Sequence, residues 1–288
     1  MEENKIKALL QLLNDDDSQT FELIRSQIMD IGSQIMPYIL EAQHHSIDED
    51  YNARLSLVYN DLNLENAIQE LKAWQQNNYK NLFHGLTVIA KYQYPRLEMS
   101  RISGLLNKIR QDAWLELKDT NTALEKVKVL NQVFFNMHSY HGNVNDYYAP
   151  ENSFINDVLL QKKGNPIALS ALYSIVAQSL GIPIYGVNTP RNFMLVYLDK
   201  TYSFPIDEVQ EKNVLFYINP YGKGEVHSMK DIFGYLKRIN QEVKSEFYLP
   251  CSNSTIIKRS INNIIVAFDR KSRPDIVANY TKLLSVFG

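Results

Sequence analysis

Two side chains of the sequence could serve as a nucleophile, Cys251 and Ser170. Cys251 is the single cysteine and lies in YLPCSNS, whereas Ser170 lies inside the apolar run NPIALSALYS. A thiol or hydroxyl becomes an effective nucleophile when a nearby base or positive charge activates it. Neither residue has a recognisable base nearby in the sequence. We therefore interpret Ser170 as a structural mid-helix hydroxyl and Cys251 as an ordinary thiol.

The histidines are the other candidates, as general bases or metal ligands. They are His44, His45, His84, His138, His141 and His227. His138 and His141 are three residues apart, but the spacing supplies no third ligand, and the adjacent His44 and His45 need not point the same way. The GKG at 222–224 is a turn, because a phosphate-binding loop needs more glycines and a following helix. The sequence predicts neither a metal nor a cofactor.

A long uncharged stretch, from Gly164 to Pro190, must position any site in this part of the chain. Asn165-Pro166 is typical of a helix start, and Gly181 followed by Pro183 is typical of a helix end. The enclosed helix is about 15 residues long and contains serines and a glutamine, so it is too short and too polar to span a membrane. Its apolar residues surround the helix axis, which predicts a helix buried in a core. The pieces IPIYGV and FMLVYL that follow have strand character.

The remaining sequence predicts an α+β fold with a helical region at 1–138, a core at 139–250 and a helical hairpin at 251–288. The first helices resemble one unit of a HEAT-like array. Further helices are predicted near 51–60, 62–77, 80–92, 97–117 and 121–138, with Trp74 and Trp114 as core residues. After the loop HSYHGNVNDYYAPENSF come a strand-turn-strand in VLFYINPYGKGEV, a capped helix in SMKDIFGYLKRIN and a hairpin that turns at RKSRPD.

Composition limits the classes of function. The formal net charge is -2, so no excess of either sign predicts a nucleic acid or a membrane as the partner. One cysteine cannot form an internal disulfide, and the first residues, MEENKIKALLQLLNDDD, are unlike a signal peptide. We expect a cytoplasmic protein.

The segment from Phe135 to Gly224 resembles the transglutaminase-like superfamily, and more specifically its branch named for a bacterial invasion-gene regulator. The resemblance rests on GNVNDYYAPENSFINDVL, KKGNPIALSALYSIVAQSLGIPIYGVNTP, the NF of PRNFMLVY, and YINPYGKG. It implies a papain-like core with a small antiparallel sheet, preceded by a helical segment.

For the wider superfamily, the resemblance implies a cysteine at the start of the buried helix, a histidine on the next strand and an aspartate on the strand after it. The helix dipole would stabilise the thiolate, and the aspartate would orient the histidine. The corresponding positions here are Pro166, Asn192 and Asn219. The branch commonly has proline at the first position but tends to keep the histidine and the aspartate. Proline has no nucleophile and asparagine does not titrate near neutral pH, so a Cys-His-Asp reaction cannot run at these positions.

The resemblance also implies that a set of neutral polar side chains converges on the former active site. The candidate cleft residues are Tyr147, Tyr148, Asn152, Asn165, Ser170, Asn192, Asn219 and Tyr221. They either satisfy the backbone of a long loop or line a pocket for a peptide or small ligand. We favour the first interpretation, because buried loops need such partners.

We therefore predict a catalytically inactive transglutaminase-like protein that acts as a protein- or peptide-binding, regulatory module. Whether the chain is an enzyme stays open, and the residues at the three expected catalytic positions count against it. The alternative is a hydrolase or acyl transferase that works without a cysteine, through a different set of residues in the same cleft. A titratable group in the cleft would distinguish the two. A third reading is a structural subunit of a larger assembly, which a large exposed apolar patch would favour.

Overall fold

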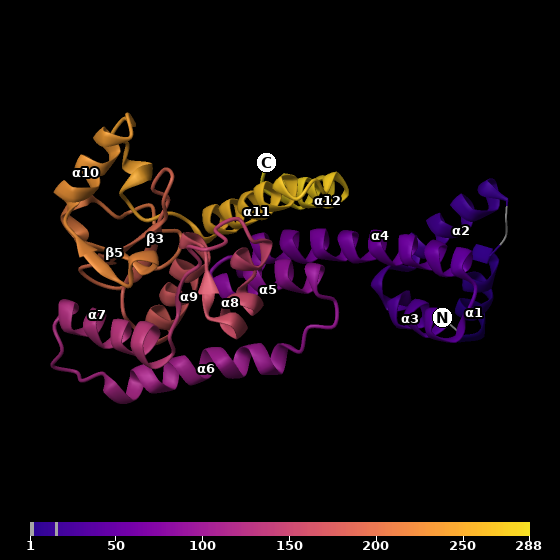
Figure 1. Cartoon of the computed structure of the whole chain (residues 1–288), viewed down its shortest axis with the longest axis horizontal. Helices are drawn as coiled ribbons and strands as arrows, with labels where there is room; N and C mark the ends of the chain where they lie inside the picture. The colour runs from indigo at the N-terminus through magenta and orange to yellow at the C-terminus, as the bar shows by residue number, and fades with distance from the viewer. Residues whose placement is uncertain (1–2, 15–16) are drawn as a thin grey trace. The chain divides into compact units, whose positions relative to one another are not determined.

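The computed structural model describes residues 3–14 and 17–288, which form two compact units, Met1–Lys72 and Ala73–Gly288. Figure 1 shows their elements, and each unit is described by itself. The sequence-based division at 138 and 250 concerns segments of the chain and stays a prediction.

The first unit is helical. Its helices are α1 (Glu3–Gln11), α2 (Ser18–Ile31), α3 (Met36–His45) and α4 (Glu49–Ala73). The side chain of Asp17 caps α2 by accepting a hydrogen bond from the backbone N–H of Thr20, 2.9 Å away. Gly32, with a φ of 77°, ends the same helix. Apolar side chains on one side of each helix then form the unit's core.

The prediction of two helices at 51–60 and 62–77 is wrong, because α4 runs unbroken from Glu49 through the expected break to Ala73. The sequence has no proline or glycine between them, and Val58 and Leu62, four residues apart, are both buried on one face. The regular helix ends at Ala73, where a π-helical turn over Trp74–Asn78 begins.

The second unit surrounds one buried helix, α9, with other helices and a small sheet. Its helices are α5 (Leu82–Gln93), α6 (Met99–Glu116), α7 (Ala123–Asn131), α8 (Ile155–Gln161), α9 (Pro166–Ser179), α10 (Met229–Arg238), α11 (Asn253–Arg270) and α12 (Pro274–Leu284). The predicted start and end of α9 are confirmed: Asn165 Oδ1 accepts from Ala168 N at 2.9 Å, and Gly181 has a φ of 71°. The C-terminal hairpin of α11 and α12 is also confirmed.

The sheet has four antiparallel strands in the order β3-β4-β5-β6. They are β3 (Ile184–Val187), β4 (Met194–Leu198), β5 (Val214–Asn219) and β6 (Glu225–His227). A second, two-stranded parallel pair joins β1 (His141–Gly142) to β2 (Lys163–Gly164). Each strand follows its neighbour directly, so the predicted small antiparallel sheet is confirmed as a meander.

The strand register places the two faces of the sheet against different helices. Met194 pairs with Val187, and Val196 pairs with both Tyr185 and Tyr217, so these side chains share one face. Ile232 and Leu236 of α10 pack against this face, while α9 packs against β3 and β4 on the other side (Figure 1). Helix α10 is thus held on this face by the buried Ile232 and Leu236, with further apolar side chains of the same helix packed around them.

The two tryptophans differ from each other in burial. Trp74 is 1% exposed, and its indole N–H donates to Asn81 O at 2.8 Å, as expected of a core residue. The prediction that Trp114 is a core residue is wrong, because its side chain is 66% exposed. On α6 the buried positions include Ile109 and Ala113, and Trp114 lies about 140° around the helix from Ile109.

Candidate functional site

Pro166 occupies the first position of α9, where the superfamily resemblance implies a cysteine. The residue is buried, and its ring supplies neither a proton donor nor a nucleophile. Asn165 before it is fully engaged, because Oδ1 caps the helix and Nδ2 donates to Ser153 Oγ at 2.8 Å. The start of this helix therefore has a structural role and carries no reactive side chain.

Asn192 and Asn219 line one pocket, which we call the sheet–α10 pocket. Its volume is about 640 Å³, and it lies where the ends of β4, β5 and β6 meet α10. The lining residues are Thr189, Asn192, Met194, Asn219, His227, Lys230, Asp231, Ile232, Gly234, Tyr235 and Arg238. Pro166 is not among them.

The register of β5 and β6 brings His227 to this pocket. Tyr217 pairs with His227 and Asn219 pairs with Glu225, so Asn219 and His227 lie on the same face, diagonal to each other. In the sequence, His227 is eight residues from Asn219 and no spacing pattern links it to either asparagine. Only the pairing of the strands shows that this titratable side chain lies in the same pocket as the two asparagines.

Two atoms of the pocket wall are left without hydrogen bonds. Among the described residues, Asn219 Oδ1 and His227 Nε2 are buried and have no hydrogen-bond partner. The nearest carboxylate oxygen to His227 Nε2 is Glu225 Oε2 at 3.9 Å, which is too far for a hydrogen bond. Buried polar atoms are usually paired, so these two leave unused hydrogen-bonding capacity beside the pocket, although Asn52 Oδ1 and Asn156 Oδ1 elsewhere in the described residues share this state.

Asn192 lies two residues before β4 and is held at the rim by the residues that follow it. Its Oδ1 accepts from the backbone N–H of Phe193 at 2.8 Å, and its Nδ2 lies 3.5 Å from the sulfur of Met194. An asparagine in this position offers an amide N–H to the pocket but no titrating group.

Helix α10 turns one continuous stripe toward the pocket. Asp231, Gly234, Tyr235 and Arg238 follow the spacing i, i+3, i+4 and i+7, which places them on one face. Gly234 leaves this stripe open, because a Cβ there would meet no atom within 4 Å. The stripe therefore has a carboxylate at one end, a guanidinium at the other and free space between them.

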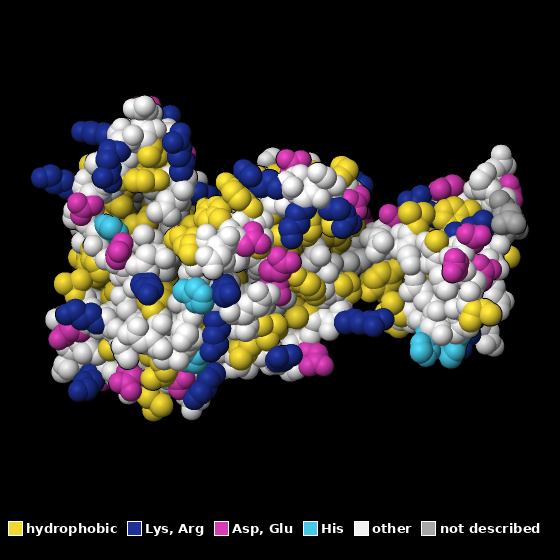
Figure 2. All heavy atoms as spheres, viewed as in Figure 1, with side chains coloured by type: hydrophobic (Ala, Val, Ile, Leu, Met, Phe, Trp, Pro, Cys, Tyr) yellow, Lys and Arg dark blue, Asp and Glu magenta, His cyan; other side chains and the backbone are white. Residues whose placement is uncertain are grey.

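The charge around the stripe is mainly positive. The carboxylate of Asp231 is engaged at the helix start, where Oδ2 accepts from the N–H of Ser228 at 2.8 Å and from its hydroxyl at 2.7 Å. These bonds lower the pKa of Asp231. Lys230 and Arg238 are exposed at the rim, and basic side chains gather over α10 in Figure 2.

Three guanidinium groups act electrostatically on Tyr235. Burial raises the pKa of Tyr235, while the positive charges of Arg191, Arg259 and Arg238 oppose that rise. The Tyr235 hydroxyl donates to Pro190 O at 2.9 Å, which ties α10 to the loop before β4.

The other predicted cleft residues build a loop and do not line this pocket. Asn152 Nδ2 donates to the carbonyls of Asp146 and Tyr147, at 2.7 and 3.1 Å, and its Oδ1 accepts from Asn143 Nδ2 at 2.9 Å. Ser170 is buried, with its hydroxyl 3.5 Å from Phe193 O.

Three tyrosines of the predicted cleft lie together beside that loop. The Tyr147 ring meets the rings of Tyr148 and Tyr221, at centroid distances of 5.1 and 6.2 Å. The guanidinium of Arg270 lies over Tyr148, 3.7 Å from its centre. The structure thus divides the predicted set into three groups. Asn165 and Ser170 belong to α9, and Asn192 and Asn219 line the sheet–α10 pocket. The others, Tyr147, Tyr148, Asn152 and Tyr221, lie in or beside the loop.

The remaining reactive groups have ordinary partners. Burial raises the pKa of Cys251 to about 12, so its thiol is not ionised near neutral pH. His138 Nε2 lies 2.9 Å from Asp112 Oδ2. Over residues 3–14 and 17–288, no three His, Cys, Asp or Glu side chains are placed to share a metal ion.

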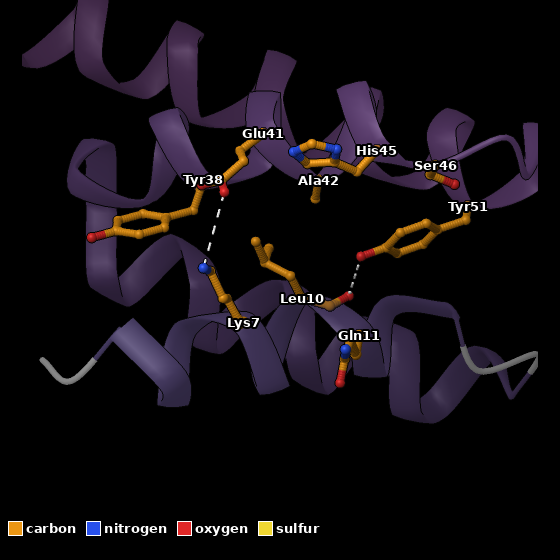
Figure 3. Close-up of a pocket in the computed structure, with 9 residues that line it drawn as sticks. All are labelled: Lys7, Leu10, Gln11, Tyr38, Glu41, Ala42, His45, Ser46 and Tyr51. Carbon is orange, nitrogen blue, oxygen red and sulfur yellow. Dashed lines mark hydrogen bonds and ion pairs between the residues drawn. The ribbon is translucent and has the colours of Figure 1, made fainter.

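A second pocket lies in the first unit, between α1 and α3 (Figure 3). Its volume is about 450 Å³, and its lining residues are Lys7, Leu10, Gln11, Tyr38, Glu41, Ala42, His45, Ser46 and Tyr51. Lys7 and Glu41 face each other across it at 4.0 Å, and the Tyr51 hydroxyl donates to Leu10 O at 3.0 Å. These contacts engage Lys7, Glu41 and Tyr51, and none of the positions that the resemblance implies lines this pocket, so it is the weaker candidate. In the described part of the chain, no helix combines the length and apolarity that a membrane crossing needs.

Comparison with known proteins relates the chain to one family and to two kinds of relative. A family model described as the transglutaminase-like superfamily matches residues 100–262. A UPF0162 protein of Xylella fastidiosa (strain 9a5c) is 25% identical over 197 residues, which is 66% of each chain. F-box only protein 21 of Homo sapiens is 25% identical over 239 residues, which is 75% of this chain and 37% of that protein. The chain thus spans less than two thirds of either relative. No solved structure matches it significantly.

Proposed function

The chain belongs to the transglutaminase-like superfamily. We propose that it is a catalytically inactive member that binds a protein or peptide, with Pro166, Asn192 and Asn219 at the positions where the resemblance implies Cys, His and Asp. The observation that carries the proposal is the sheet–α10 pocket. Two of the three substituted positions line a pocket of a size suited to a ligand, and neither can transfer a proton.

The chemistry of the pocket supports binding more than turnover. Met194, Ile232 and Tyr235 supply apolar surface, and the polar groups are amides, one imidazole and rim charges. Ligand sites are typically mostly apolar with a few convergent polar groups. The lone thiol of Cys251 suits a reducing compartment, so the proposal places the protein in the cytoplasm.

The test blocks the pocket without disturbing the fold. In Gly234→Leu the new side chain enters the open part of the stripe, and in Gly104→Leu the same change is made inside α6, where a Cβ also meets nothing within 4 Å. Both changes replace a helical glycine with a better helix former, so both variants should fold at least as stably as the wild type.

Partners would be captured from native lysate with the wild type and both variants. Each captured partner would then be purified, and its binding to the three proteins measured directly. We expect a partner that binds wild type and Gly104→Leu equally and is lost from Gly234→Leu. A partner retained by Gly234→Leu would move the binding surface elsewhere and contradict the proposal.

One observation favours the rival, a cysteine-independent hydrolase or acyl transferase. His227 supplies the titratable group that the cleft was expected to lack. Against it, His227 Nε2 has no hydrogen-bond partner among the described residues, so it contacts neither a nucleophile nor an orienting carboxylate as a catalytic base would. Hydrolysis of a panel of aryl esters and amides by the wild type, lost in His227→Gln, would support the rival. Equal background rates would leave the binding role.

A further inference from the structure

Resting on the proposed binding role, we propose that the sheet–α10 pocket takes a singly charged carboxylate that is carried next to an apolar side chain. The source is either the C-terminal end of a peptide or an Asp or Glu side chain within one. The proposal rests on the charges at the rim, the apolar floor and the open space at Gly234.

The charges facing the pocket favour an anion. Lys230 and Arg238 are exposed lining residues, and neither has an acidic partner among the ion pairs of the described residues. Arg191 and Arg259 add positive charge near Tyr235. A guanidinium presents its N–H groups in a fork that matches a carboxylate, so Arg238 is suited to hold one.

Arg259 is a second reason to expect an anion. It is half-buried, and its Nη1 donates to the neutral oxygens Asn188 Oδ1 and Thr189 O, each at 2.8 Å. It also lies over the Phe193 ring at 5.6 Å. A cation that is partly withdrawn from water is stabilised by a negative group nearby, and Thr189, the residue that Arg259 holds, is itself part of the pocket wall.

One lining residue limits the charge of the ligand. Asp231 keeps its carboxylate ionised through the bonds from Ser228, so a ligand must approach with a negative charge nearby. A phosphate ester carries about two negative charges at neutral pH, so Asp231 would repel it more than a carboxylate with one, while the basic residues would also attract it more. We assign the carboxylate because its repulsion from Asp231 is smaller, and phosphate serves as the competitor that tests this choice.

The apolar part of the pocket wall suits an apolar side chain next to the ligand's carboxylate. Met194, Ile232 and Tyr235 form the apolar wall, and the missing side chain at Gly234 leaves room beside it. An apolar peptide side chain would fill this space while the carboxylate lies at Arg238.

The experiment compares peptides that differ in one charge. Acetylated tetrapeptides with randomised last two residues are made as free acids, as C-terminal amides, and as amides with an internal Asp or Glu. Dissociation constants are measured with the full chain by fluorescence anisotropy, and inorganic phosphate serves as a competitor.

Arg238→Gln tests the site and Lys237→Gln is its control. Both remove one positive charge from the last turn of α10, but only Arg238 lines the pocket. We expect free acids or acidic peptides to bind at least tenfold more tightly than neutral amides, with about a tenfold loss in Arg238→Gln and little change in Lys237→Gln. Preference for free acids would assign a chain end, and equal binding of acidic amides would assign a side chain.

Three results would overturn the inference. They are equal binding of neutral amides and acids, an equal loss in both variants, and no peptide bound while phosphate binds. In any of these cases a partner lost only in Gly234→Leu would still support the proposed binding role, so the failure of one proposal is distinct from the failure of the other.

Discussion

Gly85 and Gly234 both lie inside α-helices, yet replacing each with alanine should change the stability of the second unit in opposite directions. In Gly234→Ala the added Cβ meets nothing within 4 Å. The change removes backbone freedom from the unfolded chain and raises helix propensity, which should stabilise by about 1 kcal/mol.

Gly85 gains the same propensity but lacks the space. A Cβ there would lie 2.8 Å from Cε2 of Trp74 and 3.0 Å from Cδ1 of Ile257, both buried. The indole ring is rigid and held by its bond to Asn81, so it cannot move aside without disturbing its neighbours. Overpacking of this kind costs about 1–3 kcal/mol, which exceeds the gain in helix propensity.

Both variants gain the same helix propensity, so they should differ by the overpacking cost alone, about 1–3 kcal/mol in the free energy of unfolding. For a unit of this size, each kcal/mol corresponds to roughly 2–4 °C in Tm. Guanidinium chloride unfolding followed by tryptophan fluorescence is the assay, because Trp74 and Trp114 both lie in the second unit and report on it alone.

A Gly85→Ala variant as stable as the wild type would refute the reasoning, since it would mean that the Trp74 contact relaxes freely. A destabilised Gly234→Ala would refute the other half, because it would place a required close contact or an unusual backbone at a position inside a regular helix. Gly104→Ala, also with an open Cβ position, should behave like Gly234→Ala.

Two further predictions follow from the burial of particular side chains, the two tryptophans and Cys251. Trp74→Ala should cost about 3–5 kcal/mol, whereas Trp114→Ala should change stability by less than about 0.5 kcal/mol, measured by the same unfolding assay; similar losses would contradict the assigned burial. The pKa of Cys251 is raised to about 12, so iodoacetamide at pH 8 should label the native thiol far more slowly than the unfolded one, and rapid native labelling would rule out this pKa. Since the folded pKa is the higher one, stability from this group is present below the ordinary thiol pKa and is lost as pH rises toward 12.

The sequence predicts those parts of the fold that local rules decide. The signals at Asn165-Pro166 and Gly181 mark the ends of α9, because capping and left-handed backbone are properties of a few neighbouring residues. Trp114 shows the limit: helical spacing identifies an apolar residue but not which neighbours cover it. The break expected near residue 61 was wrong for a similar reason, since polar residues inside a long helix are compatible with one exposed face.

The same reasoning predicted only part of the candidate site. The resemblance pointed to Asn192 and Asn219, which line one pocket. His227 was missed because its place depends on the pairing of β5 with β6, and no short-range signal in the sequence gives that register. Arg238 was missed because a basic residue at a helix end is common and has an ordinary explanation, the helix dipole.

Helix α9 has a consequence for how the second unit opens. It is uncharged and buried along almost its whole length, and its cap residue, Asn165, also holds Ser153 of the preceding loop. Amide hydrogens in such a helix exchange with solvent only when the whole unit unfolds. Native-state exchange should therefore show α9 as the last segment to take up deuterium. Helix α10, whose outer face is exposed, should exchange earlier, so the sheet–α10 pocket can open and close while the centre of the unit stays folded.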